Sequence, residues 1–545
     1  MNKYIFNVFI LIFFSVLASC SEEKVSEITE PVKSFSVIFD GGVVEGVIDH
    51  SSGTIQLLGI SDGNLINDVS YELYDGAVFY PDPQSFIGVW DKEMSIVVRL
   101  GSEVKNYTII LPDYKEQTGI IHINPGRKAQ KVEFIGGDME RSQAFLQKAA
   151  NPEDVAQWCF GDVHFDICRV SYDKQQQMNE SSANMGFYNN PIKSMKLLKK
   201  VNPNIKFWAT LKSDYAGYNG ENNMPEWIYD SKNKKFYPDK YARFLANYLK
   251  HMDNKGVHID YMSVCKEWLQ VVNYLEEITV IKEIKRICKE EKNIQPPLFV
   301  GPASWGLMQG VNFMKRIIEQ GEEDLYYGFC THNYGPEGKN YAYEKFVEAA
   351  NSVNKFAFLD EEGPGSTFSS PTSTDPEKMD GVCGIYCRKA EFWKDGIQGE
   401  LFFEVFSRDN KSKTRPVFFT DGGMAVRQRT YYVMKEYTNG ISRKNMNYIP
   451  YSTEGINAGI GEGISFMAFA NDSELFLVIV NPQDKSQSKV SVSLPEEYSL
   501  GKAVRTVFEI NLPPEGVKDE LEYADNSYIM DFPAKSVVFL SVSLQ

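Results

Sequence analysis

The sequence has no long run of lysine or arginine, and its 73 acidic residues outnumber the 57 basic ones, for a formal net charge of −16. Such a chain repels a phosphate backbone, so nucleic acid is excluded as an expected partner. The sequence also has no internal repeat and no low-complexity stretch. Because 43% of its residues are hydrophobic and 13% are aromatic, it can bury a large core, which excludes the disordered and fibrous classes.

Apolar runs long enough to span a membrane are absent as well. The longest, from Tyr4 to Leu17, has about fourteen residues, whereas a spanning helix needs about 20. It follows Lys3 and ends at a small-residue site, so residues 1–19 are expected to be a secretory signal peptide. The string LASC that ends at Cys20 resembles the lipobox of bacterial lipoproteins. This resemblance implies that Cys20 becomes the acylated first residue.

A lipid anchor at Cys20 implies an extracytoplasmic protein attached to the bacterial outer membrane. Residues 20–33 are polar and are expected to form a tether. Glu22 and Glu23 directly after the cysteine resemble the surface-export signals of Bacteroidota lipoproteins, which favours exposure at the cell surface. An ordinary signal peptide with an unrelated cysteine behind it is the alternative.

Cysteines are few beyond the leader, and their number is odd. They are Cys159, Cys168, Cys265, Cys288, Cys330, Cys383 and Cys387. An odd set cannot pair completely, and several of these residues lie in apolar runs that suit a buried thiol. Only Cys383 and Cys387 are close together, which makes them a candidate local disulfide, with two free thiols as the alternative. No histidine or further cysteine lies near them, so no metal site is expected.

Three patterns divide the rest of the chain. Short alternating runs over 34–115 predict a small N-terminal Ig-like β-sandwich module. Over 116–442, apolar runs alternate with amphipathic stretches, the clearest being 239–254, which predicts the α/β class and a (β/α)8 TIM barrel. Over 443–545 alternation returns and predicts a C-terminal β-sandwich, which the run 120–124 is a candidate to join. The candidate barrel strands are 132–135, 163–170, 205–211, 259–264, 297–301, 325–331, 355–359 and 398–405.

Polar residues that follow the barrel strands are the first candidates for function, because the active face of this fold lies at the carboxyl ends of its strands. Carboxylates follow the fourth and seventh strands. Two carboxyl groups that face each other across a sugar are the minimum requirement for glycosidic cleavage, and aromatic rings pack against sugar C–H faces. The candidates are Asp138, Arg169, Trp208, Lys212, Lys266, Glu267, Trp268, Trp305, His332, Asn333, Tyr334, Glu361, Glu362 and Arg408.

Six segments between about 119 and the C-terminus resemble glycoside hydrolases of clan A, close to family 30. This family has a (β/α)8 barrel with an attached β-sandwich and cleaves β-glycosides with retention. The matching segments are FIGGDMERS at 134–142, FDICRVSYD at 165–173, the helix and fourth strand at 239–268, CTHNYG at 330–335, FAFLDEEG at 356–363 and FPAKSVVFL at 532–540.

The resemblance implies roles for several of the candidates. Glu267 would be the general acid/base and Glu361 the nucleophile, with Glu362 as the alternative nucleophile. Arg169 would orient the nucleophile and keep it ionised, since a nearby positive charge lowers the pKa of a carboxylate. His332 and its two successors would line the sugar pocket, and no cofactor is required. A retaining enzyme of this kind needs its two carboxyl groups about 5–5.5 Å apart.

One departure from the family pattern separates two functional hypotheses. The family places Asn directly before the acid/base and Pro after it, whereas this chain has Lys266 and Trp268. An ammonium group cannot accept a hydrogen bond, and its charge would depress the pKa of a neighbouring carboxyl group. The first hypothesis is a retaining β-glycoside hydrolase that acts on a polysaccharide or glycoconjugate, with an acidic or substituted sugar at this position. The second is a non-catalytic, glycan-binding surface lipoprotein.

Structural roles remain open for several candidates at this point. Arg169 could form an ion pair with Asp138 or Glu140, and His332 could be a satisfied structural group. Trp268 and Trp305 could pack within their loops. An inverting or non-glycosidic hydrolase on the same barrel is a third functional alternative.

Overall fold

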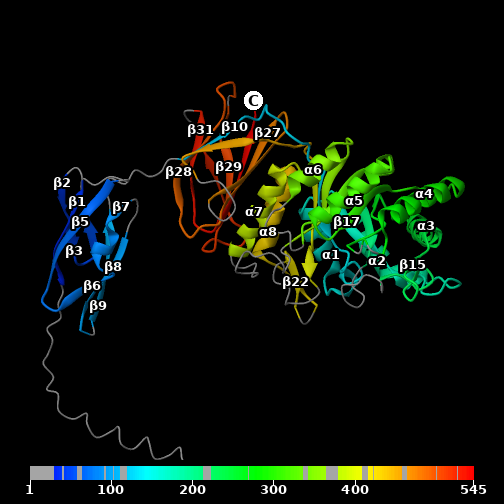
Figure 1. Ribbon diagram of the computed structural model, residues 1–545, viewed down its shortest axis with the longest axis horizontal. Coiled ribbons are helices and arrows are strands. Elements are labelled where there is room, and N and C mark those ends of the chain that lie inside the picture. The colour runs from blue at the N-terminus through cyan, green and yellow to red at the C-terminus, as the bar shows by residue number, and fades with distance from the viewer. Residues whose placement is uncertain are drawn as a thin grey trace, which may run out of the picture. The chain divides into compact units, whose positions relative to one another are not determined.

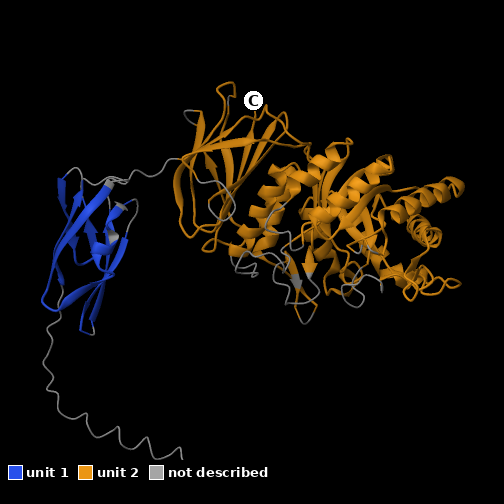
Figure 2. Ribbon diagram, viewed as in Figure 1, with its two compact units in different colours: residues 1–116 blue, residues 117–545 orange. Residues whose placement is uncertain are grey.

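The computed structural model describes residues 30–39, 42–57, 64–90, 94–101, 103–110, 119–212, 223–267, 269, 271–334, 342–363, 379–407, 415–420, 423–456, 463–498, 500–523 and 526–544. The chain forms two compact units, residues 1–116 and 117–545 (Figure 2). The expected signal peptide and Cys20 lie outside the described residues. Within those residues, no helix combines the length and apolarity that crossing a membrane requires.

The first unit consists of two β-sheets around one core. One sheet has the order β2 (Gly42–Glu45), β1 (Val32–Phe39), β5 (Asn64–Leu73), β7 (Gly88–Trp90). The other has the order β3 (Val47–Asp49), β4 (Thr54–Gln56), β9 (Glu103–Ile110), β8 (Met94–Leu100), β6 (Ala77–Tyr80). Alternate residues of the strands point inward, so Phe35 and Trp90 of one sheet meet Ile96 and Tyr107 of the other. The unit is therefore a small β-sandwich.

The second unit contains a closed parallel barrel whose strands follow the order of the sequence (Figure 1). Its strands are β11 (Phe134–Asp138), β12 (Ile167–Tyr172), β13 (Lys206–Leu211), β16 (Tyr261–Met262), β17 (Leu298–Ser304), β18 (Gly328–His332), β19 (Phe356–Glu362) and β20 (Gly399–Phe402). Each overlaps one of the eight predicted segments, and the predicted (β/α)8 barrel is confirmed.

Helices cover the outside of the barrel and alternate with its strands along the sequence. They are α1 (Pro152–Ala156), α2 (Asn189–Val201), α3 (Pro238–Asn254), α4 (Tyr274–Glu290), α5 (Leu307–Glu319), α6 (Tyr343–Asn351), α7 (Met379–Lys394) and α8 (Arg429–Ile441). Helix α3 shows why they form: Pro238 occupies its first turn, and Tyr241, Phe244, Leu245 and Tyr248 recur on one buried face.

A β-sandwich packs beside the barrel in the same unit. One sheet has the order β24 (Asn447–Tyr448), β26 (Ser465–Ala470), β27 (Glu474–Asn481), β32 (Ser536–Ser543), β29 (Ala503–Phe508), β30 (Val517–Leu521). The other has the order β25 (Tyr451–Glu454), β10 (Ile120–Ile123), β28 (Gln487–Ser493), β31 (Ser527–Phe532). Strand β10 therefore belongs to the sandwich although it precedes the barrel in sequence. Smaller sheets join β14 (Tyr229–Asp230) to β15 (Lys235–Phe236), and β21 (Phe406–Ser407) to β22 (Val417–Phe419) and β23 (Ala425–Arg427).

The candidate disulfide between Cys383 and Cys387 is wrong. Both residues lie on α7, both are buried, and both are free thiols, like every other cysteine that the structure describes. Residues four apart on a helix have Cβ atoms about 5–6 Å apart, whereas a disulfide needs about 3.5–4.5 Å. The helical geometry therefore keeps the two sulfur atoms from bonding.

Candidate active site

Glu267 and Glu361 lie together at the carboxyl end of the barrel. Glu267 follows β16, and Glu361 is the second-last residue of strand β19. One carboxylate oxygen of each residue and a ring nitrogen of His332 all lie within 4.8 Å of one another. The two glutamates are 8% and 3% exposed, so they form one small, almost buried site that still reaches solvent.

A β-bulge in β19 decides which acidic side chains enter this site. The pairing of β18 with β19 shifts between Thr331 and His332, so that Asp360 is the extra residue. Asp360 and Glu361 then both point inward. Glu362 points outward, where its Oε2 accepts a hydrogen bond of 3.0 Å from Lys389 on α7. Glu362 is fully buried behind the barrel wall, so its prediction as a substrate-facing residue and alternative nucleophile is wrong.

Three cationic groups surround the carboxylate of Glu361. Its Oε2 lies 2.5 Å from Arg169 Nη1, 3.5 Å from Lys266 Nζ and 3.5 Å from His332 Nε2. Burial by itself would raise the pKa of Glu361, but the charges of His332, Lys266 and Arg169 hold that pKa well below its ordinary value. Glu361 is therefore an anion at neutral pH.

Arg169 connects Glu361 to the base of the site. Its guanidinium contacts Asp138 at 2.7 Å and Asp360 at 3.4 Å, in addition to Glu361. Burial raises the pKa of Asp138 to about 7 although the charge of Arg169 acts in the opposite direction. Asp138 and Arg169 have no exposed surface. Arg169 contacts Glu361, as the prediction that it orients the nucleophile requires. Asp138 holds the guanidinium of Arg169, which in turn holds the carboxylate of Glu361 in position.

Lys266 points into the site rather than away from it. Its Nζ lies 3.0 Å from Glu140 Oε2 and 3.5 Å from Glu361 Oε2, and its side chain is fully buried. Burial favours the neutral form, but Glu140 and Glu361 together raise the pKa of Lys266 above its ordinary value. The pKa of Glu140 falls to about 2 because Lys266 and Lys212 outweigh the effect of burial. Glu140 was not among the residues predicted for the site, although it lies two residues after Asp138.

His332 bridges the two glutamates. Its Nδ1 lies 3.3 Å from Glu267 Oε1, and its Nε2 lies 3.5 Å from Glu361 Oε2 and 3.6 Å from Asp360. Burial would lower the pKa of His332, but Glu361 and Asp360 raise it to about 9. A protonated imidazole therefore lies between the two carboxylates. It has no exposed surface and contacts both carboxyl groups, so it can hold them in position.

The backbone of Glu267 adopts a conformation that is uncommon outside glycine. Its φ angle is 58°, in the left-handed region, where a residue with a Cβ is strained. Its N–H donates to the carbonyl of Ala303 at 2.8 Å. The residues just before it are held by Tyr172 and Tyr241, whose hydroxyls donate to the carbonyls of Ser263 and Val264, both at 2.9 Å. The barrel thus fixes Glu267 in a strained position, as is common for functional residues.

Two aromatic rings lie beside this cluster. Tyr334 packs edge-on against His332 with ring centroids 5.7 Å apart, and Trp305 lies 5.3 Å from Tyr334. Trp305 is partly exposed, so it offers an apolar ring next to the carboxylates. Lys212 lies 3.7 Å from Glu140 and keeps some exposure at the edge of the site.

Other candidates lie away from the site. Trp208 is wholly buried in the barrel core, stacked on Tyr261 at 5.6 Å, and its Nε1 donates to Ser263 Oγ at 2.9 Å. Asn333 is buried and its Nδ2 donates to the hydroxyl of Tyr343 on α6 at 3.3 Å. Both predictions of substrate contact are wrong, because these side chains pack into the protein. Trp268 and Arg408 lie outside the described residues.

Glu267, His332 and Glu361 are also the one set among the described residues whose donor atoms are close enough to hold a metal ion. Arg169 and Lys266 already neutralise Glu361, and His332 would have to lose its proton to act as a ligand. The donor set therefore suits a charge-balanced pair of carboxyl groups better than a metal ion.

No family model and no curated protein matches the sequence. Solved structures do match the fold. The family 30 xylanase C catalytic domain of Talaromyces cellulolyticus has a TM-score of 0.58 and 12% identity, over 78% of this chain and 100% of that one. A family 30 endoxylanase of Clostridium papyrosolvens has a TM-score of 0.56 and 14% identity, over 78% of this chain and 99% of that one. An endo-β1,6-glucanase has a TM-score of 0.56 and 16% identity, over 78% of this chain and 94% of that one. The chain therefore has a fold like that of family 30 glycoside hydrolases.

Proposed function

We propose that the protein is a retaining β-glycoside hydrolase that acts on a polysaccharide or glycoconjugate by double displacement. The observation that carries this proposal is the approach of Glu267 and Glu361 to within 4.8 Å between carboxylate oxygens. Retaining enzymes hold their carboxyl groups about 5–5.5 Å apart, whereas inverting enzymes need about 6.5–9.5 Å to admit a water molecule. The fold-level likeness to xylanases and a β1,6-glucanase supports a glycan as the substrate.

In the first step, the carboxylate of Glu361 attacks the anomeric carbon while Glu267 gives its proton to the departing glycosidic oxygen. The C–O bond to the leaving group breaks as the bond to Glu361 forms. In the second step, Glu267 removes a proton from water, the water oxygen attacks the anomeric carbon, and Glu361 departs. Glu361 is kept ionised before the first step by the positive charges of Arg169, Lys266 and His332. The same charges stabilise the carboxylate of Glu361 when it is released in the second step.

We also propose that the protein works outside the cytoplasm, anchored to the outer membrane through a lipid on Cys20. The apolar leader and the LASC string support this location. Labelling with a radioactive fatty acid in a bacterial host should mark the wild-type chain and should not mark Cys20→Ala. Equal labelling of the two chains would contradict the anchor and leave the hydrolase proposal unaffected.

The alternative of a non-catalytic glycan-binding protein rested on Lys266 and on the absence of Pro after Glu267. The positive charge of Lys266 is stabilised beside the nucleophile by its ion pair with Glu140. The carboxyl groups of Glu267 and Glu361 are both present in the site. The arrangement therefore favours turnover.

The test is a panel of β-linked polysaccharides and aryl β-glycosides, with the anomer of the first product recorded by NMR. Glu267→Gln and Glu361→Gln should each lose activity by about 10² to 10⁴-fold. Glu348→Gln, an exposed position on α6, is the matched control and should retain activity.

Added azide distinguishes the two roles. It should yield a β-glycosyl azide with Glu267→Gln, through the glycosyl-enzyme, and an α-glycosyl azide with Glu361→Gln, by direct attack. A first product with inverted anomeric configuration would overturn the double displacement. Binding of glycans without turnover of any member of the panel would overturn the hydrolase and support the glycan-binding alternative.

A further inference from the structure

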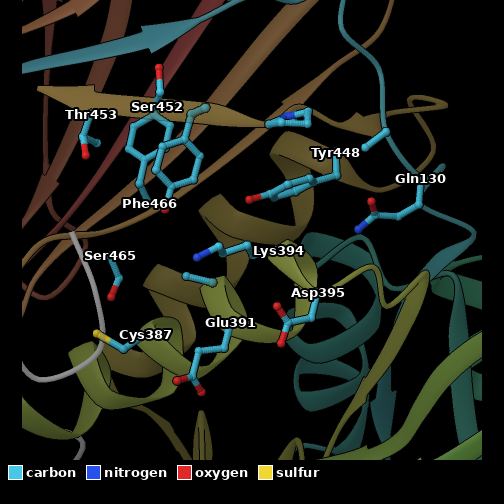
Figure 3. A pocket seen from close by; sticks show the side chains of 14 residues that line it. Gln130, Cys387, Glu391, Lys394, Asp395, Tyr448, Ser452, Thr453, Ser465 and Phe466 are labelled. Atoms are coloured by element: carbon cyan, nitrogen blue, oxygen red, sulfur yellow. The ribbon is translucent and has the colours of Figure 1, made fainter. Parts of the chain in front are cut away.

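A cavity lies at the opposite end of the barrel from the two glutamates. It is formed by the C-terminal half of α7 and by the sandwich strands β24, β25 and β26 (Figure 3). Because α7 leads back to the start of β20, this half of the helix lies at the amino ends of the barrel strands. The cavity has a volume of about 690 Å³, within the usual range of about 300–1,000 Å³ for small-molecule sites. We call it the junction pocket.

The walls of the junction pocket combine aromatic rings with groups that donate and accept hydrogen bonds. Its side chains are Gln130, Cys387, Glu391, Lys394, Asp395, Tyr448, Tyr451, Ser452, Thr453, Ser465 and Phe466, together with Ala129, Ala390 and Pro450. Lys394, Pro450 and Ser452 are exposed, whereas Tyr448 and Phe466 are buried, so the pocket has an open mouth and a closed floor. A mixture of rings and polar groups of this kind is typical of sites that bind sugars.

Three polar atoms of the pocket are buried without a hydrogen-bond partner among the described residues. They are the hydroxyl of Tyr448, the hydroxyl of Ser465 and Oε2 of Glu391. Tyr448 is only 3% exposed, and its hydroxyl points into the same space as the ammonium group of Lys394 (Figure 3). A buried polar atom that lacks a partner costs free energy, which a ligand that supplies the missing hydrogen bond recovers.

The charges around the pocket favour a neutral ligand with many hydroxyl groups. Burial and the charge of Asp395 raise the pKa of Glu391 to about 8, so at neutral pH this side chain carries a proton and can both donate and accept. Lys394 and Asp395 bear opposite charges at the same wall. Neither a cation nor an anion finds a net opposite charge there, whereas sugar hydroxyls can satisfy all of these groups.

We propose that the junction pocket is a second, non-catalytic glycan-binding site, which holds a short segment of β-linked glycan while the distant carboxyl groups act on another part. The hydroxyl of Tyr448 and the carboxyl group of Glu391 bind sugar hydroxyls, and the ring of Tyr451 contacts a sugar face. The class of ligand rests on the proposed function, whereas the location rests on the cavity and its three unpartnered polar atoms.

The test is calorimetric titration of the full chain carrying Glu267→Gln with xylohexaose and with a β-1,6-linked glucose hexamer. This background prevents turnover during the measurement. We expect two binding sites for at least one of these sugars. Adding Tyr448→Phe, which removes only the hydroxyl, should weaken the second site by about five- to tenfold. Adding Ser452→Trp at the exposed mouth should abolish the second site, and Tyr498→Phe in the sandwich is the matched control that should change nothing.

Two results would overturn this proposal. One is a single site that Tyr448→Phe and Ser452→Trp leave unchanged, and the other is no binding beyond the catalytic site by either sugar. A third result would distinguish the glycan-binding proposal for the junction pocket from the hydrolase proposal. Two binding sites in the titration, without turnover by the wild-type chain, would support the first and contradict the second. Thermal unfolding of Tyr448→Phe and Ser452→Trp checks that each variant is folded, and the two variants change different walls of the pocket.

Discussion

Lys266 offers the most direct test of how the site controls its nucleophile. Replacing it by Met keeps a long side chain and removes a positive charge 3.5 Å from Glu361 Oε2. Coulomb's law at that distance gives about 1.2 kcal/mol in bulk water and about 4.7 kcal/mol at an effective dielectric constant of 20. At about 1.4 kcal/mol per pKa unit, the charge of Lys266 lowers the pKa of Glu361 by about 1 to 3 units.

The direction of the effect follows from the group that titrates. In Lys266→Met, burial still raises the pKa of Glu361, while one of the four cations that lower this pKa is gone. Glu361 attacks only as an anion, so activity is lost as the pH falls through its pKa. We expect the acidic limb of kcat/KM to move to higher pH by about 1 to 3 units. Carbon-13 NMR of labelled glutamate carboxyls measures the same shift without a substrate, with Glu361→Gln identifying the signal.

Lys212→Met is the matched control for this experiment. Lys212 lies 3.7 Å from Glu140, the partner of Lys266, and the cations that lower the pKa of Glu361 most are His332, Lys266, Arg169 and Arg141. The same substitution there should leave the titration of Glu361 almost unchanged. If the carboxyl of Glu361 titrates at the same pH in Lys266→Met as in the wild-type chain, Lys266 does not control the nucleophile and the reasoning fails.

Three further predictions concern stability. Glu362→Gln should lower the free energy of unfolding by about 3–5 kcal/mol in urea, because it leaves the buried ammonium of Lys389 with one carboxylate fewer. An unchanged urea midpoint would contradict its role behind the barrel wall. Trp208→Ala should lower the free energy of unfolding by about 3–5 kcal/mol in urea, because it opens a cavity in the barrel core. A decrease below about 1 kcal/mol would contradict the burial of this ring in the core. Dithiothreitol should leave the melting temperature unchanged, because Cys383 and Cys387 are free; a fall would reveal a disulfide.

The barrel was predictable because its strands and helices have different hydrophobic periods. The segment 239–254 shows helical spacing throughout, and it forms α3 within a residue of the predicted start. The polar residues after the strands were predictable as a group, because parallel strands bring their carboxyl ends to one face. Their individual directions were not. Trp208 and Asn333 both lie near strand ends, yet each packs into the protein.

Glu361 and Glu362 show why direction needs the fold. The two side chains are identical and adjacent, and the bulge at Asp360 is what turns one toward Arg169 and the other toward Lys389. A bulge arises from the pairing of two strands, so no local pattern in one strand reveals it. Glu140 was missed for a related reason, since its importance comes from Lys266, which is 126 residues away in sequence.

The order of amino acids alone determined which segments become strands and helices, that the strands close into a barrel, and that Glu267 and Glu361 follow its fourth and seventh strands. These features depend on short-range periodicity, which a single chain displays without any partner. The tertiary structure alone decided that the two glutamates meet, that Lys266 turns toward them with Glu140 beside it, and that a pocket opens between α7 and the sandwich. These features depend on contacts between distant segments, where burial and charge act only after the chain has folded.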